Sequence, residues 1–369
     1  MLNYEFQKGL KKMAHCKKRC ISLFLTDVCN LNCKYCYCKS SETHAKREID
    51  FEFVKTAIND FYAKEKKIYL RFFGNGEPTL CFELMKKIVN YCRELDKDSK
   101  FELQSNGFFN EEICEWVGEN IDIVWISYDG TPEANAFYRV KHDNTVANEV
   151  VERNIKYLTS KTNILGVRST IGRKNLKCQK EMVDNMERLG VKYLFSDIMF
   201  ASVEDNDFYE ESISPMEYAR EYLEARKYAN TKNIYYGAFF TINFDEKAKI
   251  FCRSCIPMPH LTVDGYVSCC DMAYVGDENN ELIYGKYDKE NDRIIYNEEK
   301  IKYIQNRTVD NLPKCKECPV KYNCAGGCIG EALNEKGSIY DIKEENCEAI
   351  RFLYENLKDE KIEIPVFHP

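Results

Sequence analysis

Between residues 21 and 200 the chain alternates short apolar runs with longer amphipathic stretches. Two of these stretches, Phe51–Lys64 and Phe82–Leu95, carry apolar residues at steps of three and four, the one-face pattern of a helix packed on a sheet. The apolar runs between such stretches predict six strands: Ile21–Thr26, Ile68–Phe73, Phe101–Gln104, Ile123–Tyr128, Ile164–Thr170 and Tyr193–Ile198. Alternation of strand and helix indicates parallel βα units. Because six units are fewer than the eight of a closed barrel, we predict an α/β fold with a partial (β/α)6 barrel.

The pattern changes beyond residue 210. Pro215–Tyr228 predicts a bridging helix. From about Lys247 cysteines become dense, and the strand-like segments Tyr266–Ser268 and Ile294–Tyr296 replace the strand–helix alternation. We therefore predict five regions: an N-terminal segment 1–20, the barrel 21–210, a bridging helical region 211–246, a metal-organised domain 247–354 and a C-terminal tail 355–369.

Composition and charge exclude several classes of function. The 369 residues carry a net charge of −7, so no basic footprint argues for nucleic acid. No apolar run is long enough to span a membrane, and the N-terminus lacks the layout of a signal peptide. We therefore expect a cytoplasmic protein. Disulfides are rare in a reducing compartment, so the 19 cysteines favour metal or redox chemistry and suit an anaerobic host.

Three closely spaced cysteines, Cys29, Cys33 and Cys36, form a C-x3-C-x2-C motif in the stretch Cys-Asn-Leu-Asn-Cys-Lys-Tyr-Cys. A 4Fe–4S cluster is normally held by four cysteines, so three leave one iron open. An open iron can bind a small molecule and pass it an electron, as reductive cleavage of S-adenosylmethionine (SAM) requires. The alternatives are a zinc site, with Cys38 as a fourth ligand, and disulfides.

A second cysteine array occupies the C-terminal third. It consists of Cys252 and Cys255 as C-x2-C, then Gly265 and Cys270, then Cys315, Cys318, Cys324 and Cys328 as C-x2-C-x5-C-x3-C, and finally Cys347. The alternative interpretation is a pair of structural zinc sites.

Both arrays resemble a known family. Cys29, Cys33, Tyr35 and Cys36 resemble the signature of radical SAM enzymes, and the second array is similar to their SPASM extension. The resemblance implies SAM and three 4Fe–4S clusters, one SAM-binding and two auxiliary. The implied ligands are Cys252, Cys255, Cys270 and Cys328 for the first auxiliary cluster, and Cys315, Cys318, Cys324 and Cys347 for the second. The family varies at the position of Cys252 and can leave that cluster open. Cys269 is a rival of Cys270, although the Gly265 spacing favours Cys270.

The resemblance also implies the SAM contacts. The segment from Gly74 to Glu77 resembles the family's Gly-Gly-Glu-Pro motif, with Asn75 in place of a glycine, and its strand end would bind the methionine ammonium. The other implied contacts are Tyr35 on the adenine, Ser105 in the pocket wall, Ser127 on the ribose or carboxylate, and Arg139 on the carboxylate. The alternatives are a simple turn at Gly74, Asn75, Gly76 and Glu77, core packing for Tyr35, and a surface salt bridge for Arg139.

As an oxidoreductase of this family, the chain would make a 5′-deoxyadenosyl radical that abstracts hydrogen from a peptide or protein side chain. The first hypothesis is maturation of a ribosomally synthesised peptide (RiPP) by a thioether, C–C or C–O cross-link. Only 28 residues precede Cys29, too few for the fused leader-binding domain that many such enzymes carry. We therefore expect either a separate leader-binding protein or recognition of the peptide without one. An electron donor such as flavodoxin or ferredoxin is a further expected partner.

Two other hypotheses stay open. The second is an anaerobic sulfatase-maturing enzyme that forms formylglycine. It is favoured by Asp271, which follows Cys270 where that family places its proposed general base; the alternative for Asp271 is a turn residue. The third is an iron–sulfur electron-transfer protein without radical chemistry. The sequence assigns no role to Cys16, Cys20, Cys38 or Cys269, and it leaves the oligomeric state open.

Overall fold

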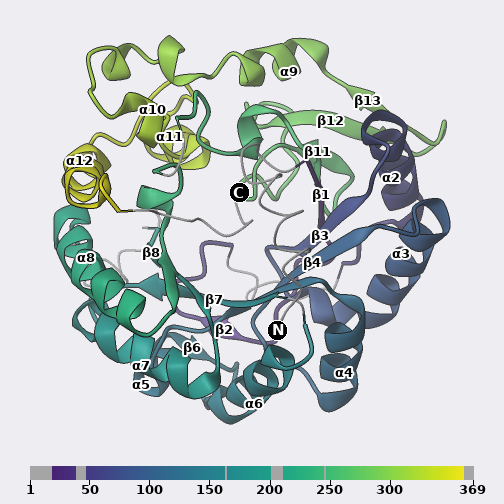
Figure 1. The fold of residues 1–369 in the computed structure, drawn as a ribbon. Coiled ribbons are helices and arrows are strands. Elements are labelled where there is room, and N and C mark those ends of the chain that lie inside the picture. Colours follow the sequence, from purple (N-terminus) through teal and green to yellow (C-terminus); the bar gives the residue numbers. More distant parts are fainter. Residues whose placement is uncertain (1–18, 39–46, 163, 201–210, 245–246, 361–369) are drawn as a thin grey trace.

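One mixed sheet runs through the whole protein, with helices outside its curve (Figure 1). The structure, a computed structural model, describes residues 19–38, 47–162, 164–200, 211–244 and 247–360. Cys16, most of the predicted N-terminal segment and the end of the predicted C-terminal tail lie outside the described residues. No helix of the described residues is long and apolar enough to cross a membrane.

The sheet has 11 strands in the spatial order β13-β12-β11-β10-β1-β3-β4-β5-β7-β8-β9. Their bounds are β1 Ile21–Phe24, β3 Tyr69–Phe73, β4 Lys100–Ser105, β5 Ile123–Ser127, β7 Ile164–Ile171, β8 Tyr193–Ile198, β9 Tyr235–Gly237, β10 His260–Leu261, β11 Tyr266–Ser268, β12 Ile283–Asp288 and β13 Arg293–Tyr296. The strands from β10 through β1 to β9 are parallel to their neighbours, whereas β11, β12 and β13 are added antiparallel. A separate pair joins β2 (Asn32–Cys33) to β6 (Arg139–Val140).

The helices lie mainly outside the curve of parallel strands, and α12 packs beside α8 (Figure 1). Their bounds are α2 Phe51–Glu65, α3 Phe82–Leu95, α4 Glu111–Asn120, α5 Pro132–Tyr138, α6 Asn148–Thr159, α7 Gln179–Leu189, α8 Pro215–Thr231, α9 Glu298–Gln305, α10 Lys321–Cys324, α11 Ile329–Lys336 and α12 Glu345–Leu357. Short 3-10 helices are η2 Pro78–Cys81, η3 Leu176–Cys178, η5 Phe239–Thr241, η6 Arg253–Cys255, η7 Val309–Asn311 and η8 Pro313–Cys315.

Helix starts follow from local sequence. Asp50 caps α2 by accepting a hydrogen bond from the backbone N–H of Glu52. At α8, Ser214 and Glu217 form a reciprocal capping box, and Pro215 occupies the first turn. These side chains satisfy backbone donors that a helix leaves unpaired, which explains why the helices begin where they do.

The predicted α/β fold is confirmed, and the six predicted strands correspond to β1, β3, β4, β5, β7 and β8. The structure adds a seventh barrel strand, β9, which pairs in parallel with β8. Its three residues, Tyr235–Gly237, are too few to give an apolar run that sequence reasoning could detect. The predicted bridging helix, α8, therefore connects two strands of the same sheet, β8 and β9.

The cysteine-rich region joins the other edge of the barrel. Strand β10 pairs in parallel with β1, in the register Ser22 with His260 and Leu23 with Leu261. Strands β11 to β13 then extend the sheet past β10. The domain boundary at residue 247 stays a prediction, but the two regions share one continuous sheet.

Aromatic side chains of β5 and β8 meet across β7, the strand that lies between them. Trp125 of β5 packs edge-on against Phe195 of β8, with ring centroids 5.5 Å apart. A Cβ atom on Gly166 of β7 would lie 2.0 Å from the Trp125 ring. The strand β7 therefore needs glycine at this position, because the indole occupies the space of a side chain.

We predict that Gly166→Ala lowers the free energy of unfolding by about 1–3 kcal/mol, because the added methyl overpacks the interior. Denaturant titration measures this loss. Adding Trp125→Leu to the Gly166→Ala variant removes the clashing ring and should recover part of the loss. The account of the interior would be contradicted if the double variant lost as much free energy of unfolding as the sum of the losses in Gly166→Ala and Trp125→Leu.

Candidate functional site

A cavity of about 300 Å³ opens at the C-terminal ends of the barrel strands and collects most of the residues singled out in the sequence. Active sites of parallel barrels lie at this end of the strands. The sequence-predicted residues that line the cavity are Cys29, Cys33, Tyr35, Cys36, Gly74, Asn75, Gly76, Glu77, Ser105, Ser127, Arg139, Cys252, Cys270, Asp271 and Cys328. Residues from both cysteine arrays thus face one space.

The loop with the three clustered cysteines is held by backbone pairing. Asn32 and Cys33 pair antiparallel with Val140 and Arg139. Two N–H groups point at the Cys29 sulfur, from the backbone of Leu31 and the side chain of Asn106, each at 3.5 Å. Hydrogen-bond donors directed at a sulfur atom stabilise its negatively charged thiolate form. The loop is therefore fixed in place with its thiols at the cavity wall.

The three thiols of the loop, Cys29, Cys33 and Cys36, line one cavity, as ligands of an iron–sulfur cluster would. Burial raises the pKa of Cys29 to about 11 and that of Cys33 to about 12, so a bound cation is needed to keep these thiols deprotonated. No group of three or more His, Cys, Asp or Glu side chains in the described part of the chain stands close enough to hold one metal ion. A 4Fe–4S cluster is larger and spreads its thiolates apart. Cys38 lines the same cavity, so the structure leaves it as a further thiol near the loop.

The turn after β3 is packed against the cysteine loop. A Cβ atom on Gly76 would lie 2.5 Å from the carbonyl oxygen of Val28 and 2.6 Å from that of Thr26, so only glycine fits. The backbone N–H of Glu77 donates to the Val28 carbonyl at 2.9 Å. This close approach places the turn beside Cys29. The side-chain oxygen of Asn75 is buried in the cavity wall and meets no partner in the described residues.

The Glu77 carboxylate is fully buried and is held by neighbouring donors. Its Oε1 accepts from the Thr79 hydroxyl at 2.7 Å and the Ser105 hydroxyl at 2.8 Å, and its Oε2 accepts from the backbone N–H of Asn106 at 2.8 Å. Burial raises the pKa of Glu77, and these donors oppose that rise. Oε2 keeps room for one more donor on the cavity side.

Tyr35 and Arg139 are joined to Asp129 in a buried network. The Tyr35 hydroxyl donates to both carboxylate oxygens of Asp129, at 3.0 and 2.9 Å, and accepts from Arg139 at 2.6 Å. Burial raises the pKa of Asp129 to about 6, against the lowering effect of Arg139. Both Tyr35 and Arg139 line the cavity, but their predicted contacts with the adenine and the carboxylate of SAM stay predictions.

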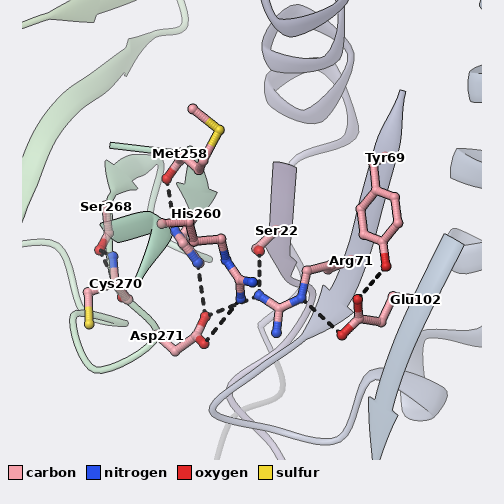
Figure 2. Close-up of polar contacts among 10 residues, drawn as sticks. Ser22, Tyr69, Arg71, Glu102, Met258, His260, Ser268, Cys270 and Asp271 are labelled. Atoms are coloured by element: carbon pink, nitrogen blue, oxygen red, sulfur yellow. Dashed lines mark hydrogen bonds and ion pairs between the residues drawn. The ribbon is translucent and has the colours of Figure 1, made fainter. Parts of the chain in front are cut away.

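Asp271 lines the same cavity and lies beside His260 and Arg71 (Figure 2). Its carboxylate is 3.0 Å from Nε2 of His260, 3.7 Å from Arg71 and 3.9 Å from Arg253. Burial raises the pKa of Asp271, but Arg71, His260 and Arg253 outweigh this and hold the pKa well below its ordinary value. The carboxylate is therefore ionised and a weak base, whereas a general base works best with a pKa near the operating pH.

His260 links this wall to the barrel. Its Nδ1 lies 3.0 Å from the carbonyl oxygen of Met258, and its Nε2 faces Asp271. Arg71 of β3 reaches the same cluster and also bonds Ser22 at 3.0 Å and Glu102 at 3.3 Å (Figure 2). The cluster thus connects three barrel strands with the cysteine-rich region.

The second cysteine array divides between two cavities. Cys315, Cys318, Cys324 and Cys347, the implied ligands of the second auxiliary cluster, all line a smaller cavity of about 80 Å³. Of the other four, Cys252, Cys270 and Cys328 line the main cavity, and Cys328 lines the smaller cavity as well. Cys255 is buried and lines neither cavity, but its backbone N–H donates to the Cys252 carbonyl at 3.2 Å. The structure therefore gathers the four implied ligands of the second cluster at the smaller cavity, with Cys328 between the two cavities. The assignment of Cys255, and of Cys270 over its rival Cys269, stays a prediction.

Sequence reasoning missed several residues of the main cavity, among them Gln104, Arg168, Asp197, Arg253 and His260. Gln104 could have been found, since it stands two positions after Glu102 on the same face of β4. Its side-chain oxygen is buried without a partner in the described residues. Arg253 and His260 carry no spacing signal, because they reach the cavity only through the pairing of β10 with β1.

A family model described as the Radical SAM superfamily matches residues 23–170. An uncharacterised protein of Methanocaldococcus jannaschii is 32% identical over 181 residues, 48% of this chain and 61% of that protein, so the match spans less than two thirds of this relative. A cysteine-type anaerobic sulfatase-maturating enzyme of Clostridium novyi is 24% identical over 330 residues, 81% of this chain and 84% of the relative. The radical SAM cyclopropyl synthase TigE of Paramaledivibacter caminithermalis is 20% identical, over 92% of this chain and 74% of its own.

Solved structures share the fold. Native anSMEcpe with bound AdoMet superposes with a TM-score of 0.75 at 18% identity, over 91% of this chain and 96% of its own. Streptococcus suis SuiB bound to precursor peptide SuiA gives a TM-score of 0.64 at 15% identity, over 92% of this chain and 78% of its own. The likeness covers the barrel and the cysteine-rich region together.

We predict that Tyr35→Phe lowers the free energy of unfolding by about 1–3 kcal/mol, because it removes the hydroxyl that satisfies buried Asp129 and Arg139. Denaturant titration measures the loss. Tyr91→Phe is the matched control, since its hydroxyl meets exposed Asn59, and it should cost less than about 0.5 kcal/mol. Equal losses in the two variants would contradict the role given to the network.

Proposed function

We propose that this chain, whose residues 23–170 match the Radical SAM superfamily model, is a radical SAM enzyme that abstracts hydrogen from a peptide or protein side chain. The observation that supports this most is the shared cavity, which brings the three-cysteine loop, the predicted SAM contacts and thiols of the second array together. We propose maturation of a ribosomally synthesised peptide, by a thioether, C–C or C–O cross-link, as the biological reaction.

The cysteine loop would hold the SAM-binding 4Fe–4S cluster through Cys29, Cys33 and Cys36. Cluster and SAM together supply a one-electron reduction that yields the 5′-deoxyadenosyl radical. The protein's part is to orient the SAM methionine. Glu77 Oε2 has acceptor capacity left for the ammonium, and Arg139 presents a forked guanidinium suited to a carboxylate.

Water exclusion is a second task of the cavity. Its walls include Phe73, Phe239 and Phe251 from three separate segments. Phe239 also packs against Phe251, with ring centroids 6.3 Å apart. An apolar wall protects a reactive species from water and side reactions. These aromatic side chains would thus surround the substrate bond that is attacked.

The second array would form a SPASM-type extension with two auxiliary clusters. The group of four thiols at the smaller cavity supports a fully ligated cluster there. The three thiols at the main cavity support a second cluster close to the substrate. Such clusters would accept the electron left on the product radical.

The partners follow from this reaction. A peptide or protein substrate is supported by the relatives, since SuiB is solved with its precursor peptide and anSMEcpe with a peptide. We further propose an electron donor such as flavodoxin or ferredoxin and, for the peptide, a separate leader-binding protein.

A second candidate function is anaerobic sulfatase maturation with formylglycine as the product. The relative from Clostridium novyi matches 81% of this chain, and Asp271 faces the cavity as that reaction's proposed base would. The three basic neighbours of Asp271 weaken it as a base, which is why we keep peptide cross-linking first.

We predict that the reconstituted, reduced protein converts SAM to 5′-deoxyadenosine and contains about 12 iron per chain, as three clusters require. Cys29→Ala should lower the conversion at least about 100-fold, because the SAM-binding cluster loses a ligand. Chromatography of 5′-deoxyadenosine measures both. The control is Cys114→Ala in α4, outside both cavities, which should keep the conversion. Stoichiometric zinc without iron would overturn the proposal.

We predict that a peptide encoded next to this gene, incubated with the enzyme, loses two mass units when a cross-link forms. The two lost hydrogens are those removed from the bonded atoms, and mass spectrometry measures the change. The comparison is a peptide derived from a sulfatase. In that peptide a Ser would lose two mass units, or a Cys would become an aldehyde. Modification of the sulfatase peptide alone would favour the second candidate function.

A further inference from the structure

Arg253 is a buried cation on the cavity wall whose donors are unused. It begins η6, between Cys252 and Ser254, and lines the main cavity. Its side chain is only 8% exposed, and its nearest acidic group is Asp271, at 3.9 Å from Nη2. That separation is too long for a hydrogen bond. Among the described residues, the guanidinium makes no hydrogen bond.

The other arginines around the cavity differ from Arg253. Arg139 and Arg168 also line the cavity, and each donates a side-chain hydrogen bond, Arg139 to Tyr35 and Arg168 to Asp197. Asp271 cannot serve Arg253 alone, because it also faces His260 at 3.0 Å and Arg71 at 3.7 Å. Arg253 therefore lines the cavity with five N–H donors that make no hydrogen bond to the described residues.

A buried guanidinium without hydrogen-bond acceptors is costly, because it has lost water and here keeps only a shared ion pair with Asp271. Its position in a cavity indicates that a ligand supplies the missing acceptor. The planar fork of arginine matches the two oxygens of a carboxylate. We propose that Arg253 binds a carboxylate of the peptide substrate and thereby orients the peptide in the cavity. The identity of the ligand as a peptide rests on the proposed function.

The carboxylate has two sources in a peptide: an Asp or Glu side chain, and the C-terminus. Either would place a negative charge between Arg253 and the cavity, on the far side of the guanidinium from Asp271. The negative Asp271, the positive Arg253 and the negative peptide carboxylate would then follow one another along the cavity wall. Arg253 would select peptides that carry a carboxylate near the modified residue, and it would act on substrate binding.

Three tripeptides test the proposal on the reconstituted holoenzyme with SAM. Acetyl-Ala-Asp-Ala-amide carries only a side-chain carboxylate, acetyl-Ala-Asn-Ala with a free C-terminus carries only a terminal one, and acetyl-Ala-Asn-Ala-amide carries none. Anaerobic calorimetry measures their dissociation constants. One charged peptide should bind at least tenfold more tightly than the neutral one, and which of the two does so identifies the source.

Variants then assign the effect to the guanidinium. Arg253→Gln should remove the preference for the charged peptide, and Arg253→Lys should keep part of it, because a lysine retains the charge but not the fork. Arg93→Gln, whose arginine bonds Asn120 on the surface, should keep the full preference. Iron content shows that each variant keeps its clusters.

Two results would overturn the proposal. One is equal binding of all three peptides to the wild type, as expected if the donors meet sulfur atoms of a neighbouring cluster. The other is an undiminished preference in Arg253→Gln. Failure of the proposed function is a separate outcome: wild-type protein would then bind carboxylates selectively yet form no 5′-deoxyadenosine.

Discussion

The parallel pairing of β10 with β1 is the contact on which the arrangement of the site depends. Only two residue pairs define it, Ser22 with His260 and Leu23 with Leu261, and a backbone bond of 2.8 Å from Ser22 to Pro259 extends it. This pairing brings the segment from Cys252 to Asp271 to the mouth of the barrel. Together with the packing of α12 on α8, it lets one cavity collect residues of both cysteine arrays.

Side-chain contacts strengthen the same junction. Arg71 of β3 bonds Ser22 and Glu102 inside the barrel and also lies 3.7 Å from Asp271 of the cysteine-rich region. His260 packs its ring near Phe24, with centroids 6.1 Å apart. Buried charges are tolerated here because each has a partner on another strand. These contacts tie Asp271 to strands of the barrel.

The sequence predicted the barrel strands well and the junction poorly. Strands such as Ile123–Ser127 are buried on both faces, so they appear as continuous apolar runs that local reasoning detects. Strands β9 and β10 have three and two residues, and their pairing depends on contacts remote in sequence. No local pattern encodes such contacts, so the continuity of the sheet into the cysteine-rich region could not be predicted.

The site shows the same division. Cys29, Cys33, Cys36 and the turn at Gly76 were found by spacing, because a loop that holds a cluster needs its residues close in sequence. Gln104, His260 and Arg253 come from distant segments and meet only in the folded chain. Cys255, which the family resemblance groups with Cys252, Cys270 and Cys328, is buried and does not line the main cavity as those three do.

The central claim is that the loop of Cys29, Cys33 and Cys36 holds a cluster with one open iron that binds SAM. Electron–nuclear double resonance of the reduced protein with SAM labelled by ¹⁷O in its carboxylate tests this most directly. The account predicts a hyperfine coupling between that oxygen and the cluster, lost in Cys33→Ala. An intact, reduced cluster with no coupling to the label would contradict it.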